Sequence, residues 1–310
     1  MTIDPADPSA SLFGILPPLI MPFDGTTGRL AENALAEQAR WMIAAGAAGV
    51  VVGEGAGTGN ALTPDEHAAA ISAAQDGLGG RRSLLAGLAS AGTEDALRHA
   101  RILGGLGIDA LLVTPAPFPD HSARRAVIDH FRALHGESGL PLLIDNTHRR
   151  NRLDTPMLLE AMGEVAGIIG VTQGPDDLEA LAGLLLDLPD DKVAMSGIDA
   201  LLYPSFTLGA HAVTGALTAA LPHVCVALHR AVRGGDHETA RGVHDCLLRL
   251  WTTFAGDDPF ACARHVQNRQ GLPALEPRVT GDRASDGRMN RIDSELKPIL
   301  AMLQHFGRAA

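Results

Sequence analysis

The chain has 310 residues, a formal net charge of −11 at pH 7, 46% hydrophobic residues and 20% charged residues. This composition provides enough apolar material for a sizeable core and too little charge for a disordered chain. There is no basic block and only 4% of the residues are aromatic. A nucleic-acid partner is therefore excluded, because the phosphate backbone is bound by clustered Lys and Arg.

Eight short apolar runs recur along the chain, and such runs are typical of parallel strands that are covered on both faces. The predicted strands are Ile15–Ile20, Gly49–Gly53, Leu84–Leu88, Ala110–Thr114, Pro141–Asn146, Ile168–Thr172, Val193–Ser196 and Ala212–Ala216. Helical patterns lie between them, and several begin with a capping residue, a proline or acidic residues. These starts are Thr63-Pro64-Asp65-Glu66, Thr93-Glu94-Asp95, Thr155-Pro156 and Pro175-Asp176-Asp177.

Repeated strand–helix alternation indicates either a closed parallel barrel or a large doubly wound sheet. The even spacing favours the α/β class and a (β/α)8 TIM barrel with a C-terminal helical extension. We expect a flexible N-terminal segment over residues 1–13, the barrel over 14–230 and the extension over 231–310. After the eighth strand, the predicted elements are helices Pro222–Arg233, His237–Phe254, Pro259–Gln270 and Ile292–Phe306, with an irregular connection over Gly271–Met289.

No segment is predicted to enter a membrane or to direct secretion. Residues 200–229 lack Asp, Glu, Lys and Arg, but Pro204, Gly209, Gly215 and Pro222 interrupt them where elements should end, so buried elements explain them better than a membrane span. Residues 1–13 are acidic and contain proline, unlike a signal peptide. The three cysteines have no metal-type spacing, and we expect reduced, buried thiols in a cytoplasmic protein.

Active sites of such barrels are built from loops at the C-terminal ends of the strands. Glu54 and Asp145 fall there, and two carboxylates facing one pocket could act as acid and base or, with His148, hold a divalent cation. Alternatively, they pair with Arg149, Arg150 or capping amides. Spacing alone does not supply convergent metal ligands, so no metal and no cofactor are predicted.

The glycine-rich run Gly53–Gly59 follows a strand, but it does not form a nucleotide-binding motif. Its alternating glycines do not fit G-x-G-x-x-G, and no lysine follows them as in a P-loop. Backbone amides in such a loop could still hold a carboxylate. Most of the thirteen histidines lie in predicted helices, and His148 alone stands on a loop of the expected site, where a structural role competes with a catalytic one.

Seven short segments resemble the dihydrodipicolinate synthase and N-acetylneuraminate lyase family in order and spacing, from about Gly14 to Gly271. They are Leu19-Ile20-Met21-Pro22-Phe23-Asp24, Gly49-Val50-Val51-Val52, Leu62-Thr63, Leu112-Val113-Thr114-Pro115, Leu140-Pro141-Leu142-Leu143-Ile144, Gly170-Val171 and Ser196-Gly197-Ile198-Asp199-Ala200-Leu201-Leu202. The resemblance implies a barrel of the aldolase type and, because the family is usually tetrameric, a homotetramer or homodimer.

The resemblance also locates a difference in chemistry. The family joins pyruvate to a lysine in a G-x-K-E motif at the end of strand six, where this chain reads Gly170-Val171-Thr172-Gln173. A threonine hydroxyl cannot form a protonated imine with a ketone. The chain has only two lysines, Lys192 before strand seven and Lys297 in the C-terminal helices, and neither is expected at the site.

Other motif positions differ as well. The family's Y-N-x-P-x-R motif corresponds to residues 145–150, so Asp145 replaces its tyrosine and Arg150 matches the arginine that lies near a substrate carboxylate. The family's threonine pair after strand two corresponds to Gly55-Ala56. Tyr203 is the only tyrosine of the chain, so a tyrosine relay is excluded.

Two functions fit these residues. The first is a lyase-type enzyme acting on a small oxo- or carboxylate-bearing metabolite without an imine, and not a true dihydrodipicolinate synthase. The second is an inactive family member that serves as a binding or assembly protein. For the enzyme, the predicted catalytic residues are Asp145, Thr172 and His148, and the predicted substrate-binding residues are Glu54, Gly55, Ala56, Gly57, Arg150, Gly197 and Thr214.

Overall fold

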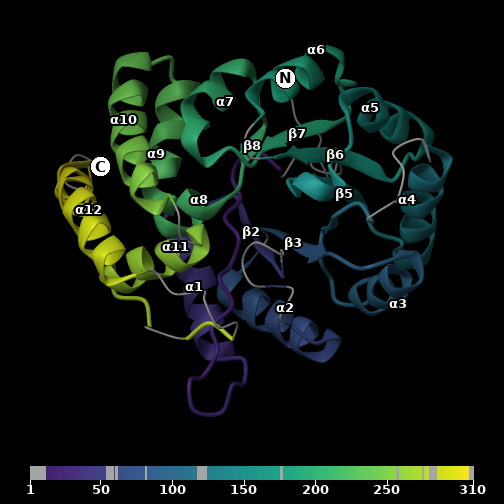
Figure 1. Cartoon of the computed structure of the whole chain (residues 1–310), viewed down its shortest axis with the longest axis horizontal. Helices are drawn as coiled ribbons and strands as arrows, with labels where there is room; N and C mark the ends of the chain where they lie inside the picture. The colour runs from purple at the N-terminus through teal and green to yellow at the C-terminus, as the bar shows by residue number, and fades with distance from the viewer. Residues whose placement is uncertain are drawn as a thin grey trace.

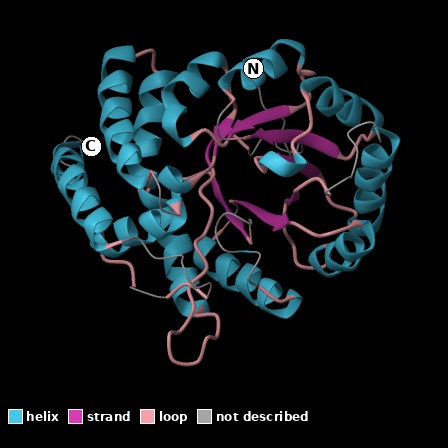
Figure 2. Cartoon of the chain, viewed as in Figure 1, coloured by secondary structure: helices cyan, strands magenta, loops and turns pink. Residues whose placement is uncertain are grey.

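The chain forms an eight-stranded parallel barrel surrounded by helices (Figure 2). The structure is a computed structural model that describes residues 12–53, 59, 62–80, 82–116, 124–174, 177–255, 258–273, 276–278 and 285–306, without the side chains of 302–306. The strands are β1 (Gly14–Ile15), β2 (Gly49–Val52), β3 (Ser83–Leu88), β4 (Ala110–Val113), β5 (Leu142–Asn146), β6 (Ile168–Gln173), β7 (Val193–Ser196) and β8 (Ala212–Val213). The predicted TIM-barrel fold is confirmed.

Helices follow the strands in turn and cover the outside of the barrel (Figure 1). The barrel helices are α1 (Glu32–Ala44), α2 (Pro64–Leu78), α3 (Thr93–Leu103), α4 (Arg124–Ser138), α5 (Thr155–Glu164), α6 (Leu178–Asp187), α7 (Leu202–Leu208) and α8 (Ala216–Ala220), with 3-10 turns η4 (Arg149–Asn151) and η5 (Asp199–Leu201). The chain continues with α9 (Pro222–Arg233), α10 (His237–Phe254), α11 (Pro259–Arg269) and α12 (Asp286–Phe306). Among the described residues, no helix is long and apolar enough to span a bilayer.

The barrel closes between β1 and β2 through backbone hydrogen bonds that extend beyond β1. Ala48 N donates to Ile15 O at 2.9 Å, and Leu19 N donates to Val51 O at 2.8 Å. Pro17 has no N–H to donate between these bonds, so beyond Gly14–Ile15 the pairing continues only as the isolated bridge Pro18↔Val51, in which Val51 N donates to Pro17 O at 3.0 Å. The strand predicted over Ile15–Ile20 is therefore confined to Gly14–Ile15.

The last strand is also shorter than predicted, because a helix begins where the strand was expected to continue. Gly215 has a φ of 144° and serves as the N-cap of α8. The carboxylate of Asp199 accepts hydrogen bonds from Ala216 N at 3.0 Å and Leu217 N at 2.7 Å. These contacts start α8 at Ala216, so the prediction of a strand to that residue is wrong.

The helix starts agree with the sequence pattern at some positions and differ at others. Thr63 forms a complete capping box with Glu66 at α2. Asp177 caps α6 by accepting from Ala180 N, whereas α5 is capped by Asp154 and not by Thr155. Thr93 does not cap α3, because it is the first helical residue there. The connection predicted up to Met289 ends earlier, since α12 begins at Asp286.

The uncharged stretch 200–229 forms α7, β8, α8 and most of α9. Gly209 ends α7 in the left-handed region with a φ of 107°, and Pro222 begins α9. Pro204 instead lies inside the first turn of α7, where a missing N–H is tolerated, so the prediction that it ends an element is wrong. Buried elements in place of a membrane span are confirmed for this stretch.

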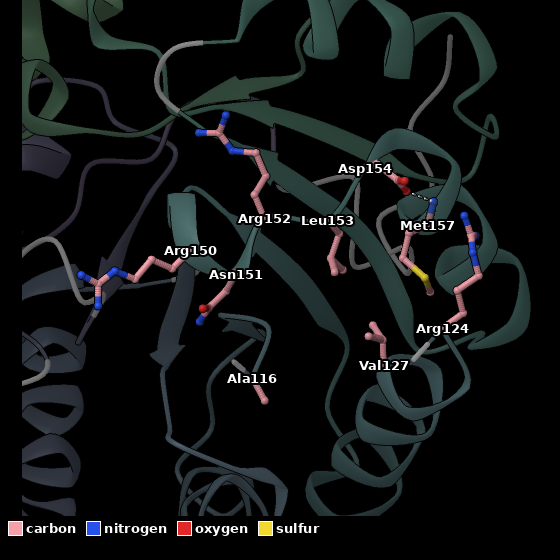
Figure 3. A pocket seen from close by; sticks show the side chains of 9 residues that line it. All are labelled: Ala116, Arg124, Val127, Arg150, Asn151, Arg152, Leu153, Asp154 and Met157. Atoms are coloured by element: carbon pink, nitrogen blue, oxygen red, sulfur yellow. Dashed lines mark hydrogen bonds between the residues drawn. The ribbon is translucent and has the colours of Figure 1, made fainter. Parts of the chain in front are cut away.

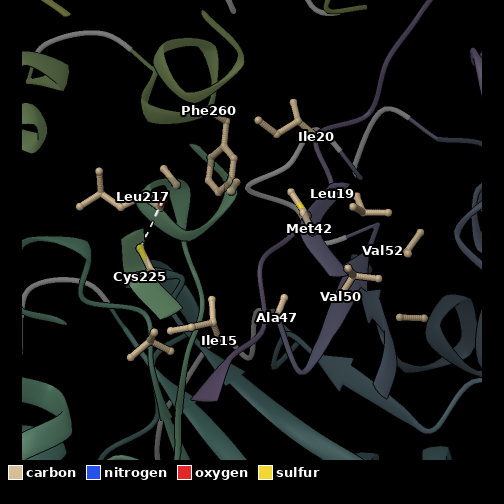
Figure 4. Close-up of a cluster of buried hydrophobic side chains, with 14 of the residues drawn as sticks. Ile15, Leu19, Ile20, Met42, Ala47, Val50, Val52, Leu217, Cys225 and Phe260 are labelled. Atoms are coloured by element: carbon tan, nitrogen blue, oxygen red, sulfur yellow. Dashed lines mark hydrogen bonds between the residues drawn. The ribbon is translucent and has the colours of Figure 1, made fainter. Parts of the chain in front are cut away.

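Two hydrophobic layers hold the barrel together. The inner layer fills the barrel and includes Val51, Leu112, Leu143 and Met195. The outer layer lies between strands and helices, and Figure 4 shows that it continues from Ile15 and Val50 to Leu217, Cys225 and Phe260. Residues of the C-terminal helices therefore share one core with the barrel, and the predicted boundary at residue 230 falls within α9. The division into barrel and extension remains a proposal.

Candidate active site

Asp145 is a buried carboxylate at the C-terminal end of β5, and it is only 2% exposed. Its Oδ2 accepts a hydrogen bond from Thr114 Oγ1 at 3.0 Å. Its Oδ1 accepts from Thr147 N at 3.1 Å and from Thr147 Oγ1 at 2.6 Å. No arginine in the described ranges forms an ion pair with Asp145, so the pairing with Arg149 or Arg150 that the sequence left open is not found. Threonine donors hold the carboxylate in place instead.

Thr172 lies beside Asp145, because the two residues are register partners on β5 and β6. Thr172 is fully buried, and its Oγ1 lies 3.8 Å from Met195 Sδ, a weak acceptor within the inner layer. Gly197 borders the same space: a Cβ built on it would lie 3.7 Å from Thr172 Cγ2 and 3.2 Å from Thr147 Cγ2. A side chain at Gly197 would therefore be tight against Thr147 and in ordinary van der Waals contact with Thr172.

Thr214 places an unpaired hydroxyl at the same end of the barrel. Its backbone N donates to Ser196 O at 3.0 Å, which continues the β7–β8 ladder by one residue. Because Ala212 belongs to the inner layer, the side chain two residues later points into the barrel. Thr214 is 1% exposed, and its Oγ1 has no hydrogen-bond partner among the described residues. Buried hydroxyls are normally hydrogen-bonded, so a bound ligand could supply the missing partner of Thr214.

His148 and Arg150 lie on the loop that follows β5. His148 Nε2 lies 3.6 Å from Asp145 Oδ2, which is longer than a hydrogen bond, and this nitrogen is buried without a partner in the described part of the chain. Arg150 is exposed in η4. The loop is fixed from below by Asn146, whose Nδ2 donates to Leu153 O at 3.0 Å and whose Oδ1 accepts from Leu153 N at 2.7 Å.

A pocket of about 330 Å³ lies beside this loop rather than at Asp145. It separates α4 from the β5–α5 connection, and its wall combines the apolar side chains of Val127, Leu153 and Met157 with arginines. Figure 3 shows Arg150 and Arg152 running away from Met157. The guanidinium groups of these two arginines therefore point away from the apolar wall of the pocket.

The structure leaves part of the predicted site outside the described residues. Glu54, Gly55, Ala56 and Gly57 all fall there, so their predicted substrate contacts remain predictions. Within the described ranges, no three His, Cys, Asp or Glu side chains converge as metal ligands.

The two lysines and the single tyrosine lie away from Asp145. Lys192 directly precedes β7, at the opposite end of the barrel, and its Nζ lies 3.1 Å from Asp191 Oδ2. Lys297 is exposed on α12. The Tyr203 hydroxyl lies 3.2 Å from His237 Nδ1, between α7 and α10.

Three residues near the site were not assigned from the sequence. Thr114 could have been found from strand alternation, because Leu112, two residues earlier, faces the inner layer. Thr147 and Arg152 lie on the loop after β5, where no periodic pattern gives the direction of a side chain. Ser90, which follows β3, donates to Gly92 O at 3.0 Å and serves its own turn.

A buried histidine of α2, His67, beside the end of β2, makes stability depend on pH. Burial, and then the nearby His99, lower the pKa of His67 to about 4. Its ordinary pKa is about 6.5, so below pH 6.5 the unfolded chain binds a proton that the folded chain does not, and stability falls until about pH 4. We expect His67→Gln to reduce the loss of unfolding free energy between pH 7 and pH 5 by at most about 2 kcal/mol.

Urea unfolding of both proteins at the two pH values measures this difference. The comparison with the variant is needed because burial raises the pKa of Asp199 to about 7, which acts in the opposite direction over the same pH range. An equal pH dependence in His67→Gln and the unchanged protein would contradict the prediction.

Known proteins resemble this chain over almost its whole length. The model of the Dihydrodipicolinate synthetase family matches residues 11–279. A 4-hydroxy-tetrahydrodipicolinate synthase of Methanospirillum hungatei is 30% identical over 91% of this chain and 98% of its own length, and that of Ruegeria pomeroyi is 27% identical over 92% and 97%. Among solved structures, dihydrodipicolinate synthase of Aquifex aeolicus has a TM-score of 0.85 at 22% identity, covering 93% of this chain and 98% of its own. A sialic acid aldolase of Ruminococcus gnavus has a TM-score of 0.85 at 17% identity, covering 96% and 99%.

Proposed function

Because the chain belongs to the Dihydrodipicolinate synthetase family, we propose that it is a lyase-type enzyme that acts on a small oxo- or carboxylate-bearing metabolite without a lysine imine. The observation that carries this proposal is the buried Thr172 beside the buried Asp145. Thr172 stands where the family resemblance places the lysine, and both lysines of the chain lie elsewhere. Activity as a 4-hydroxy-tetrahydrodipicolinate synthase, the name of the curated relatives, is therefore not part of the proposal.

Asp145 is the group that moves protons in this proposal. Its oxygens are positioned by Thr114 and Thr147, and His148 Nε2 stands 3.6 Å away. Catalytic hydrogen bonds are often long before a substrate is bound, so His148 can approach Asp145 or the substrate when a substrate binds. Removing a proton from the carbon next to a carbonyl or carboxylate begins an elimination or a condensation, and returning a proton to that carbon completes the reverse reactions, a hydration or a carbon–carbon bond cleavage.

The remaining polar groups suit substrate binding. The hydroxyl of Thr214, which has no partner among the described residues, and the weakly bonded hydroxyl of Thr172 offer hydrogen bonds to an oxo group. Gly197 leaves room beside Thr172 for the ligand. Arg150 and the amides of Gly55, Ala56 and Gly57, with Glu54 beside them, complete the substrate site in this proposal. We also expect a homotetramer or homodimer from the family resemblance.

The imine is tested directly by trapping. Incubation with pyruvate and sodium borohydride should leave the intact mass unchanged, because neither lysine is placed to attack a substrate carbonyl. The synthase of Methanospirillum hungatei, treated in the same way, is the positive control and should gain the mass of a reduced pyruvyl group by the family's chemistry. A stable pyruvyl adduct on this chain, measured by mass spectrometry, would overturn the proposal.

An inactive binding or assembly protein is the second candidate. It is favoured by Tyr203, whose hydroxyl contacts His237 on the outer helices and is not available for a proton relay at the barrel mouth. Against it stands Asp145, a buried carboxylate beside His148, whose Nε2 has no hydrogen-bond partner in the part of the chain that the structure describes. Proton exchange catalysed by the chain separates the two candidates, and a binding protein would show none.

A further inference from the structure

Arg152 has two N–H groups that nothing in the described part of the chain accepts. Its Nε and Nη2 are buried and have no hydrogen-bond partner. The ion pair that it forms within the described residues is long, with Nη1 3.8 Å from Asp177 Oδ2, and it uses another nitrogen of the guanidinium. Nε and Nη2 together form one edge of the planar group, the geometry that holds both oxygens of a carboxylate or a phosphate.

This edge lies close to Asp145 through Thr147. A Cβ built on Gly174, just after β6, would lie 3.0 Å from Arg152 Nη2 and 2.7 Å from Thr147 Cα. The distance between Arg152 Nη2 and Thr147 Cα therefore cannot exceed the sum of these two distances. Thr147 in turn donates both its hydroxyl and its backbone N–H to Asp145. The free edge thus stands at the β5–β6 side of the barrel mouth.

The position of Arg152 is fixed by its neighbours. Leu153, the next residue, is bonded through both its N and its O to the buried side chain of Asn146. Gly174 has no side chain and so leaves room for the guanidinium, because a Cβ there would lie only 3.0 Å from Arg152 Nη2. The same Cβ would also lie 2.6 Å from Asn146 O. A charged group that is held in place without partners loses little freedom when it binds an anion.

We propose that Arg152 binds the anionic group of the substrate, a carboxylate or a phosphate, through Nε and Nη2. This inference rests on the proposed function and names the residue that selects an anionic substrate there. Motif spacing points to Arg150 for this role. Arg150, however, is exposed, and Figure 3 shows that its side chain and that of Arg152 diverge from the loop. Arg152 has the buried edge that no described residue satisfies.

The test is a titration of the full chain with malonate and, separately, with inorganic phosphate, following Tm. We expect saturable stabilisation by the anion that matches the site. Arg152→Gln should weaken this binding about tenfold or more, because two charge-assisted hydrogen bonds are lost. Arg98→Gln is the matched control, since it removes the same charge from an exposed position on α3, and it should leave the binding unchanged. Arg150→Gln, at the exposed rim of the proposed substrate site, should weaken binding less than about threefold. The relative strength of the two anions distinguishes a carboxylate site from a phosphate site.

Arg152→Lys keeps the charge without the planar edge and should bind the anion less tightly than the unchanged protein, which provides a second variant if Arg152→Gln does not fold. Wild-type affinity in Arg152→Gln or Arg152→Lys, a larger loss in Arg150→Gln, or no saturable binding of either anion would each overturn the proposal. Asp145→Asn should bind the anion at least as tightly as the unchanged protein. Loss of proton exchange and loss of anion binding are therefore separate results, so failure of the proposed function is distinguishable from failure of this inference.

Discussion

Replacing Asp145 by asparagine is expected to slow proton exchange on the substrate by at least about a hundredfold, because the amide keeps the size of the side chain but cannot accept a proton. Thr114 and Thr147 donate to both oxygens of the carboxylate, and an amide retains only one acceptor oxygen. The measurement is proton NMR of a panel of 2-oxo acids in D2O, in which exchange at the carbon beside the carbonyl reports proton removal without requiring the complete reaction to be known.

Asp187→Asn is a suitable control, because the substitution makes the same chemical change at a residue that is exposed at the end of α6. It should exchange at the wild-type rate. If Asp145→Asn retained the full rate while remaining folded, Asp145 would not be the proton acceptor. If the unchanged protein catalysed exchange with none of the acids in the panel, the result would favour the binding-protein candidate.

Replacing Gly170 by alanine is expected to lower the free energy of unfolding by about 3 kcal/mol. A Cβ at this position would lie 2.2 Å from Val193 O and 2.5 Å from Val193 Cγ2. Gly170 and Val193 are register partners on β6 and β7, so the overlap is with backbone and can be relieved only by separating the two strands. Thr172 lies two residues farther along β6 and would move with it. Urea denaturation measures the loss.

Gly183→Ala is the same type of substitution, but it is expected to raise the free energy of unfolding. Gly183 lies within α6, and a Cβ there would meet nothing within 4 Å. Alanine is favoured over glycine in a helix, so this variant should gain about 0.5–1 kcal/mol. Equal stability changes in the two variants would show that the β6–β7 contact does not restrict residue 170.

Much of the fold could be predicted from the sequence, because burial on two faces leaves apolar runs of characteristic length. The bounds of β7, α9 and α10 agree with the prediction to the residue. The errors fall where backbone geometry overrides the apolar pattern. Pro17 and Pro18 shorten β1, and the carboxylate of Asp199 begins α8 early.

The candidate site was less accessible to sequence reasoning. Residues 145, 172 and 197 were chosen because they fall at strand ends, with the family motifs also marking 145 and 172, and the structure brings those ends together. Thr214 was predicted within the last strand, and the structure places it just after β8. Arg150 was chosen by motif position, but exposure and side-chain direction on a loop depend on neighbours that are distant in sequence. Arg152 became noticeable only when its unsatisfied nitrogens were located beside Gly174.

The sequence by itself determined the alternating barrel and the chemistry that its residues can offer, since two lysines and one tyrosine limit that chemistry whatever the fold. Only the tertiary structure decided which side chains face the mouth. The β5–β6 register passes from Leu142↔Ile168 to Leu143↔Gly170, which leaves Ile169 as an extra residue against the inner layer. Strict alternation from Ile169 would turn Thr172 outward. The bulge resets the alternation, and Thr172 points inward to Met195 beside Asp145.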